Sequence, residues 1–208
     1  MIKKEIYPKT QRLKCSGEKI YITEKLDGSN LVFFKKNNII HIAQRKNIYT
    51  INDIEKTEVK GIMYKGLYQW LIDNKAILEE ELLENSVICG EWLGMGCLKY
   101  SVDEFDKRWY MFAKANIDDE YNLYNIIYDH NLFKYPFKNQ MIPKFIGVVP
   151  EVVELNVLPN KEYLDSIYEK YCKKVNRNVE GFVVNYNNII SKYVRMKNGK
   201  LKEHFDRE

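Results

Sequence analysis

The stretch Lys19-Ile20-Tyr21-Ile22-Thr23-Glu24-Lys25 runs into a turn, Leu26-Asp27-Gly28, and then into Ser29-Asn30-Leu31-Val32-Phe33-Phe34. In its first part Ile20 and Ile22 recur on every second residue, which predicts a half-buried strand over residues 19–25. A second strand is expected over residues 31–35, and Gly28 between the two permits the backbone to approach a ligand closely. The pattern therefore predicts a strand-rich scaffold with Lys25 at the end of a strand.

The rest of the chain alternates short apolar strands with two helical stretches. We expect strands at 39–44, 86–92, 109–113 and 144–149, helices at 66–83 and 161–175, a hairpin of 181–186 with 189–196, and a helix or irregular insertion at 118–141. The turn at 36–38 would join the second and third strands, and Asn160 would cap the second helix. The prediction is one α+β domain over residues 1–208, built of antiparallel sheets flanked by helices.

Composition excludes some classes of protein. The chain has 208 residues, 45% of them hydrophobic, which suffices for one sizeable core. No run of about 18 apolar residues exists, so no membrane span is expected, and the N-terminus does not resemble a signal peptide. The four cysteines and three histidines are scattered without CxxC spacing, which argues against a zinc site and favours reduced thiols and a cytoplasmic location. A net charge of +4 allows a polyanionic partner without requiring one.

Several ionic residues lie at the ends of apolar strands. Glu91 and Glu180 are carboxylates beside such strands, and these are unusual unless they are paired or bind a cation. Arg195 and Lys197 are two residues apart in a predicted strand and so share a face. Each of these charges alone is equally well explained by an exposed position, and Lys25 alone by an ordinary turn. Together they suit a triphosphate with Mg²⁺, which requires both signs of charge.

In this order the motifs resemble those of ATP-dependent RNA ligases, within the superfamily of DNA ligases, RNA ligases and mRNA capping enzymes. Residues 23–30 look like the nucleophile motif, and the ending Ser29-Asn30 is more similar to RNA ligases than to the other branches. The resemblance implies that Lys25 becomes adenylylated, and it assigns further roles residue by residue. Glu24 and Asn30 would contact the nucleotide, Arg45 the nucleotide or the 5′-phosphate, Glu91 the ribose and Phe112 the adenine. Glu180 would bind the metal, and Arg195 and Lys197 would form the final Lys-x-Lys motif.

The implied function is ATP-dependent RNA ligation. It would use Mg²⁺ (or Mn²⁺), form a lysyl-AMP intermediate, and join 5′-phosphate and 3′-hydroxyl RNA ends, as in RNA repair. Two features depart from the family pattern: Arg195 stands where a lysine is usual, and Ala113 where many relatives have aspartate. The chain also ends soon after Lys197, so we expect a bare catalytic domain without a C-terminal OB domain, whose function a protein partner would supply.

Two alternatives remain at this stage. One is another member of the superfamily, a DNA ligase or a GTP-dependent capping-type guanylyltransferase. The other is a non-sealing module that binds RNA ends. A separate feature is the aromatic-rich stretch 121–137, with Lys134 and Lys138 near its rings. It is more simply interpreted as a structural cluster than as a platform on which single-stranded bases stack.

Overall fold

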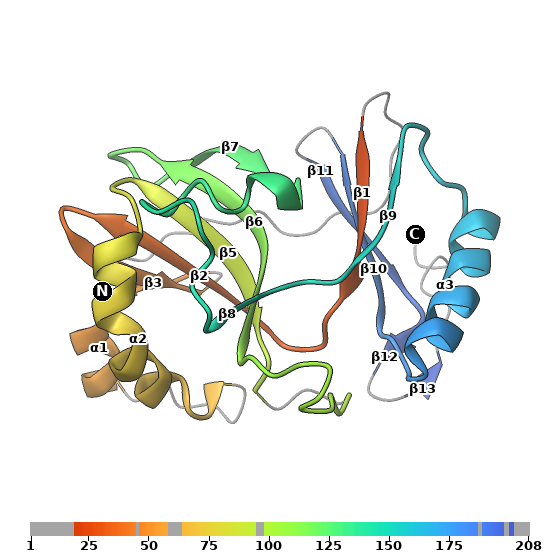
Figure 1. Ribbon diagram of the computed structural model, residues 1–208, viewed down its shortest axis with the longest axis horizontal. Coiled ribbons are helices and arrows are strands. Elements are labelled where there is room, and N and C mark those ends of the chain that lie inside the picture. The colour runs from red at the N-terminus through yellow and green to blue at the C-terminus, as the bar shows by residue number, and fades with distance from the viewer. Residues whose placement is uncertain are drawn as a thin grey trace. The chain divides into compact units, whose positions relative to one another are not determined.

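The computed structural model describes residues 19–44, 46–57, 64–94, 98–186, 189–197 and 200–201, with the backbone alone at 55–57, 197 and 200–201. These residues form two compact units. The larger unit takes its described residues from 28–94 and 100–148, and the smaller from 19–27, 98–99 and 149–201. Both mix strands with helices (Figure 1), which confirms the α+β class. One domain over 1–208 stays a prediction.

The smaller unit is built on a four-stranded antiparallel sheet. Its strand order is β11-β10-β1-β9, with bounds β1 (Ile20–Lys25), β9 (Glu151–Leu155), β10 (Gly181–Tyr186) and β11 (Ile189–Val194). The helix α3 (Lys161–Val175) lies along one face of this sheet (Figure 1). A short two-stranded sheet, β12 (Met196–Lys197) with β13 (Lys200–Leu201), follows β11.

The apolar stripe of α3 explains how the helix packs. Leu164, Tyr168 and Tyr171 are buried and share one core with Ile20 and Ile22 of β1. Asn160 caps the helix as predicted, because its side-chain oxygen accepts a hydrogen bond from the Tyr163 amide at 2.9 Å. Alternation along β1 therefore turns its even-numbered residues toward α3 and its odd-numbered residues toward the opposite face.

The larger unit is built on a seven-stranded sheet of order β4-β3-β2-β5-β6-β7, with β8 paired in parallel to β6. The strands are β2 (Ser29–Lys36), β3 (Ile39–Ala43), β4 (Ile48–Thr50), β5 (Ser86–Trp92), β6 (Trp109–Ile117), β7 (Leu123–Ile127) and β8 (Ile146–Val148). The helices α1 (Ile51–Thr57) and α2 (Leu67–Glu81) lie beside it (Figure 1). Leu67, Leu71 and Leu78 of α2 join Phe33 and Trp109 in its core.

Most predicted elements are confirmed, and the differences are limited to a few segments. Residues 118–141 form β7 and one short 3-10 turn (His130–Leu132), so the helical alternative was wrong there. No sustained period predicts α1, which has seven residues, or β9, which is only half-buried. Every strand in the described part of the chain belongs to the three sheets named above. Within that part, no helix is long and apolar enough to cross a membrane.

Candidate active site

Lys25 and Glu180 form an ion pair in the smaller unit, although they are 155 residues apart in the chain. The register places Lys25, the last residue of β1, opposite Gly181, the first of β10. Glu180 immediately precedes Gly181, so its carboxylate comes beside the lysine, and Lys25 Nζ donates to Glu180 Oε2 at 2.7 Å. The two side chains are 24% and 16% exposed, so solvent still reaches both. The structure therefore brings together two of the predicted residues.

The environment of Glu180 makes its carboxyl more basic than usual. Burial raises its pKa, and the Asp27 charge acts in the same direction, while the charges of Lys25 and Lys192 act in the opposite one. The backbone at this point is fixed, because the Glu180 carbonyl accepts hydrogen bonds from the amides of Arg195 at 2.9 Å and Met196 at 3.0 Å. A firmly held, partly buried carboxylate is thus in hydrogen-bond contact with a lysine ammonium.

The turn after Lys25 is held by protein contacts. Asp27 Oδ2 accepts a hydrogen bond from the Leu98 amide at 2.8 Å. A Cβ at Gly28 would lie 2.4 Å from the Trp92 carbonyl oxygen and 2.9 Å from Glu91 Cγ. A close backbone approach to a ligand was predicted at Gly28, and the atoms that lie this close in the structure belong to the adjacent strand β5.

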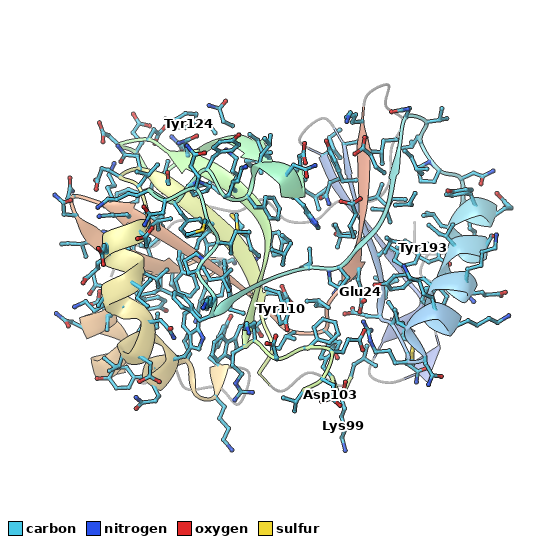
Figure 2. All side chains as sticks on the ribbon, viewed as in Figure 1. Glu24, Lys99, Asp103, Tyr110, Tyr124 and Tyr193 are labelled. Carbon is cyan, nitrogen blue, oxygen red and sulfur yellow. The ribbon has the colours of Figure 1, made fainter. Side chains whose placement is uncertain are left out.

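Glu24 lies on the face of the sheet opposite to Lys25, toward α3 (Figure 2). Its carboxylate accepts two hydrogen bonds from the Arg177 guanidinium, both at 2.6 Å, and one from the Tyr171 hydroxyl at 2.9 Å. The Glu24 side chain has no exposed area, and that of Arg177 is 13% exposed. Glu24 therefore forms a buried ion pair with Arg177 and does not lie beside Lys25.

Arg195 also lies on the α3 side. Its guanidinium donates to Asp165 Oδ1 at 2.5 Å and to the Tyr193 hydroxyl at 3.2 Å, and stands 5.5 Å from the centre of the Tyr168 ring. Burial raises the pKa of Asp165, but hydrogen bonds from Lys161, Tyr193 and Arg195 outweigh it and lower that pKa to about 2. Arg195 is therefore part of an ionic network with α3 and is not brought to Lys25.

The larger unit positions three further predicted residues. Asn30 of β2 pairs with Glu91 of β5, and Glu91 pairs with Tyr110 of β6, so these side chains share one face of the sheet. The β5–β6 register shifts between Cys89 and Gly90, and Phe112 is the extra residue of this bulge. Bulges commonly redirect a side chain. Asn30, Glu91 and Phe112 are each half-buried.

Two predicted residues cannot be placed. Arg45 lies outside the described residues, and the side chain of Lys197 is not described, although its backbone forms part of β12. Among the residues whose placement is described, no three His, Cys, Asp or Glu side chains gather into a metal-binding group. Glu180 and Asp27 are the carboxylates whose charges interact near Lys25.

Sequence reasoning missed the residues that support this site from behind the sheet. Arg177, Tyr171 and Asp165 bind predicted site residues, yet none has a motif of its own. The Glu24–Arg177 pair spans 153 residues of chain, so no local pattern could have revealed it. The alternation of β1 could have shown that Glu24 and Lys25 point to opposite faces.

Comparison with known proteins gives a family match and a shared fold. A family model described as RNA ligase matches residues 18–197. An RNA ligase from Naegleria gruberi superposes with a TM-score of 0.51 at 18% identity, covering 98% of this chain and 60% of that one. An archaeal ATP-dependent RNA ligase gives 0.53 at 13% identity, covering 91% and 48%. A protein from Aquifex aeolicus assigned as an ATP-dependent DNA ligase gives 0.50 at 14% identity, covering 91% and 49%.

The solved structures that match have low sequence identity to this chain and are longer than it. At such low identities they show the fold alone, a mixed α+β ligase nucleotidyltransferase fold with antiparallel sheets. The chain spans about half to three fifths of the length of these solved structures. A search of curated protein sequences finds no match.

Proposed function

Because the chain belongs to the RNA ligase family, we propose that it is an ATP-dependent RNA ligase that works through an AMP adduct on Lys25. The observation that carries the proposal is the 2.7 Å contact between Lys25 Nζ and Glu180 Oε2 at the aligned ends of β1 and β10. A lysine that is anchored at a strand end and still reached by solvent is suited to act on a bound nucleotide.

The first step would be transfer of AMP to the lysine. Lys25 Nζ first releases its ammonium proton to the solvent that still reaches it, and the resulting amine attacks the α-phosphorus of ATP, so that a nitrogen–phosphorus bond forms. The bond from that phosphorus to the bridging oxygen breaks, and its electron pair leaves with pyrophosphate. The proton released from nitrogen passes to the Glu180 carboxylate, which is already in hydrogen-bond contact and whose pKa is raised by burial.

The remaining steps would transfer the nucleotide and seal the strand. The 5′-phosphate oxygen of one RNA end attacks the phosphorus of lysyl-AMP, which frees Lys25 and leaves an activated 5′ end. The 3′-hydroxyl oxygen of the other end then attacks the 5′-phosphorus and displaces AMP, losing its proton as the phosphodiester forms. Positioning and charge neutralisation account for most of the catalysis in such transfers.

A divalent cation fits the donor set of the smaller unit. Glu180, with Asp27 nearby, offers carboxylate oxygens, and Mg²⁺ prefers such ligands together with water and phosphate oxygens. When bound, Mg²⁺ (or Mn²⁺) would neutralise charge on the phosphates. The proposal keeps Asn30, Arg45, Glu91, Phe112 and Lys197 as nucleotide contacts on the strength of the family motifs.

RNA is proposed as the acceptor because the matching family model is that of RNA ligases. DNA ligation is the second candidate, since the fold resembles the Aquifex aeolicus protein almost as closely as the RNA ligases. The proposal includes a cytoplasmic location. Among the described cysteines, Cys89 and Cys172 are free thiols, in keeping with this location.

The test is an adduct assay followed by a chase. The protein is incubated with α-labelled ATP or GTP and Mg²⁺, and then with 5′-phosphorylated RNA or DNA. We expect a labelled protein with ATP, its absence in Lys25→Ala, and release of the label as RNA is joined. Lys19→Ala is a matched control at the other end of β1, where Lys19 pairs with Glu154 at 2.8 Å. A lack of any adduct would favour a non-sealing RNA-end-binding module instead.

A further inference from the structure

A cluster of lysines and tyrosines lies at one edge of the larger unit, apart from the residues assigned above. Its members are Lys114 on β6, Tyr124 on β7, and Lys134 and Tyr135 in the loop after the 3-10 turn, and we call them the Tyr135 patch. Tyr124 and Tyr135 are 48% and 45% exposed. Lys114 Nζ and Lys134 Nζ stand 5.8 Å and 5.4 Å from the centre of the Tyr135 ring.

The patch is supported by ordered structure. Tyr135 lies between Phe133 and Phe137, which are both fully buried in the core of the larger unit. Tyr124 of β7 (Figure 2) pairs with Asn116 of β6, and alternation along β6 places Asn116 on the same face as Lys114. The extra residue of the register shift lies in β7, between Tyr124 and Ile127, so Lys114 and Tyr124 share a face. The exposed rings are therefore held in place before any ligand arrives, which lowers the entropic cost of binding.

The charges of the patch have no described carboxylate partner. Burial lowers the pKa of Lys114, and no acidic side chain in the described part of the chain offsets this. Four carboxylates of the surrounding segments form other contacts: Asp118 with its own turn, Asp119 with Lys36, Asp129 with Asn131, and Glu81 with Asn139. A partly desolvated ammonium that lacks a counter-ion is stabilised by an anionic ligand.

Exposed aromatic rings interleaved with lysines that have no carboxylate partner among the described residues match the chemistry of single-stranded nucleic acid. Bases stack on tyrosine rings, and ammonium groups contact the phosphates that join them. We propose that the Tyr135 patch binds a single-stranded segment of the RNA substrate. This inference rests on the proposed function, since it names the form in which the substrate is held. It also gives the aromatic stretch 121–137 a second role besides packing.

The test measures binding of a 12-nucleotide single-stranded RNA, fluorescently labelled and blocked at its 3′ end, by anisotropy at several salt concentrations. Tyr135→Ala should weaken binding roughly 5- to 150-fold, the range for loss of one base stack. Lys114→Met with Lys134→Met should reduce the slope of log affinity against log salt by about 1.4, since each phosphate contact contributes roughly 0.7. Methionine keeps the aliphatic stem of the half-buried Lys114.

Matched controls on α2 separate the patch from general surface effects. Tyr68→Ala removes another exposed tyrosine, and Lys75→Met removes a lysine whose contact is with Glu79. Both should bind RNA as the wild type does. The proposal would be overturned if the patch variants kept the affinity and the salt slope of the wild type, or if the wild type bound no single-stranded RNA. A fall in melting temperature that accounts for the weaker RNA binding of the variants would also overturn it.

The adduct assay distinguishes failure of the patch from failure of the proposed function. Adduct formation from ATP needs no RNA, so the patch variants should form it at the wild-type rate. An adduct in every variant together with unchanged RNA binding refutes the patch and leaves the proposed function standing. No adduct in the wild type refutes the proposed function itself.

Discussion

Removing Arg177 should destabilise the smaller unit through the carboxylate that it leaves behind. The Glu24 side chain is fully buried and accepts two hydrogen bonds from Arg177 and one from Tyr171. Removing one partner of a buried pair costs about 3–5 kcal/mol, because the remaining charge stays in the interior. The Tyr171 hydroxyl still donates in the variant, and Arg177 is slightly exposed. We therefore expect Arg177→Met to cost about 3 kcal/mol at pH 7.

A second substitution tests whether the stranded charge is the cause. Glu24→Gln removes the charge and keeps an oxygen that accepts the Tyr171 hydrogen bond. The double variant Glu24→Gln/Arg177→Met should lose about 1 kcal/mol, the scale of one neutral hydrogen bond, and so be more stable than Arg177→Met alone. Urea unfolding followed by circular dichroism measures both values. A cost below about 1 kcal/mol for Arg177→Met, or a double variant no more stable than the single one, would show that the unpaired Glu24 charge is not what destabilises the fold.

The same variants decide the role of Glu24. The family resemblance assigns Glu24 to the nucleotide, whereas its contacts place it behind the sheet with Arg177 and Tyr171. If the structural role is the whole role, the folded double variant forms the Lys25 adduct with an unchanged KM for ATP. A large rise in KM without loss of stability would support the nucleotide contact.

Three further predictions concern stability. The pKa of Asp165 is lowered from 3.8 to about 2, so its carboxylate contributes about 2 kcal/mol to the free energy of unfolding above pH 4, and this is lost as the pH falls toward 2. Asp165→Asn should remove this part of the acid dependence of stability. An unchanged dependence of stability on pH in the variant would contradict the prediction. Gly28→Ala should cost more than about 2 kcal/mol in thermal unfolding, because the new Cβ meets a carbonyl oxygen at 2.4 Å, and a neutral effect would disprove the steric argument. Asn160→Ala should cost about 1 kcal/mol in urea unfolding, with Asn160→Asp close to wild type; equal losses in both would exclude capping as the cause.

Local patterns predicted the elements whose signals are complete within one segment. The helix α3 carries an apolar stripe and a capping asparagine, and its predicted bounds agree with the structure. The strand β5 is likewise bounded as expected. Residues 118–141 show no clear period of apolar residues, because the structure there depends on positive φ angles at Tyr121 and Asn125 and on a shifted register between β6 and β7. The periodicity of apolar residues along the chain indicates neither a positive φ angle nor a register shift between strands.

The candidate site was predicted in part for the same reason. Order along the chain was enough to connect Lys25 with Glu180, because both stand at the ends of strands that turn out to be neighbours. Arg195 had the expected charge, but Asp165 and Tyr193 draw its guanidinium to the α3 side. No pattern near Arg195 in the sequence indicates that its partner is an acidic residue 30 positions away.

The proposed mechanism depends on Lys25 being the residue that accepts AMP. Its most direct test is mass spectrometry of the intact protein after incubation with ATP and Mg²⁺, followed by peptide mapping of the modified site. We expect one added AMP, located on Lys25 and absent from Lys25→Arg, with the Lys19→Ala control modified as the wild type is. An AMP group on any other residue, or one that persists in Lys25→Arg, would rule out Lys25 as the acceptor of AMP.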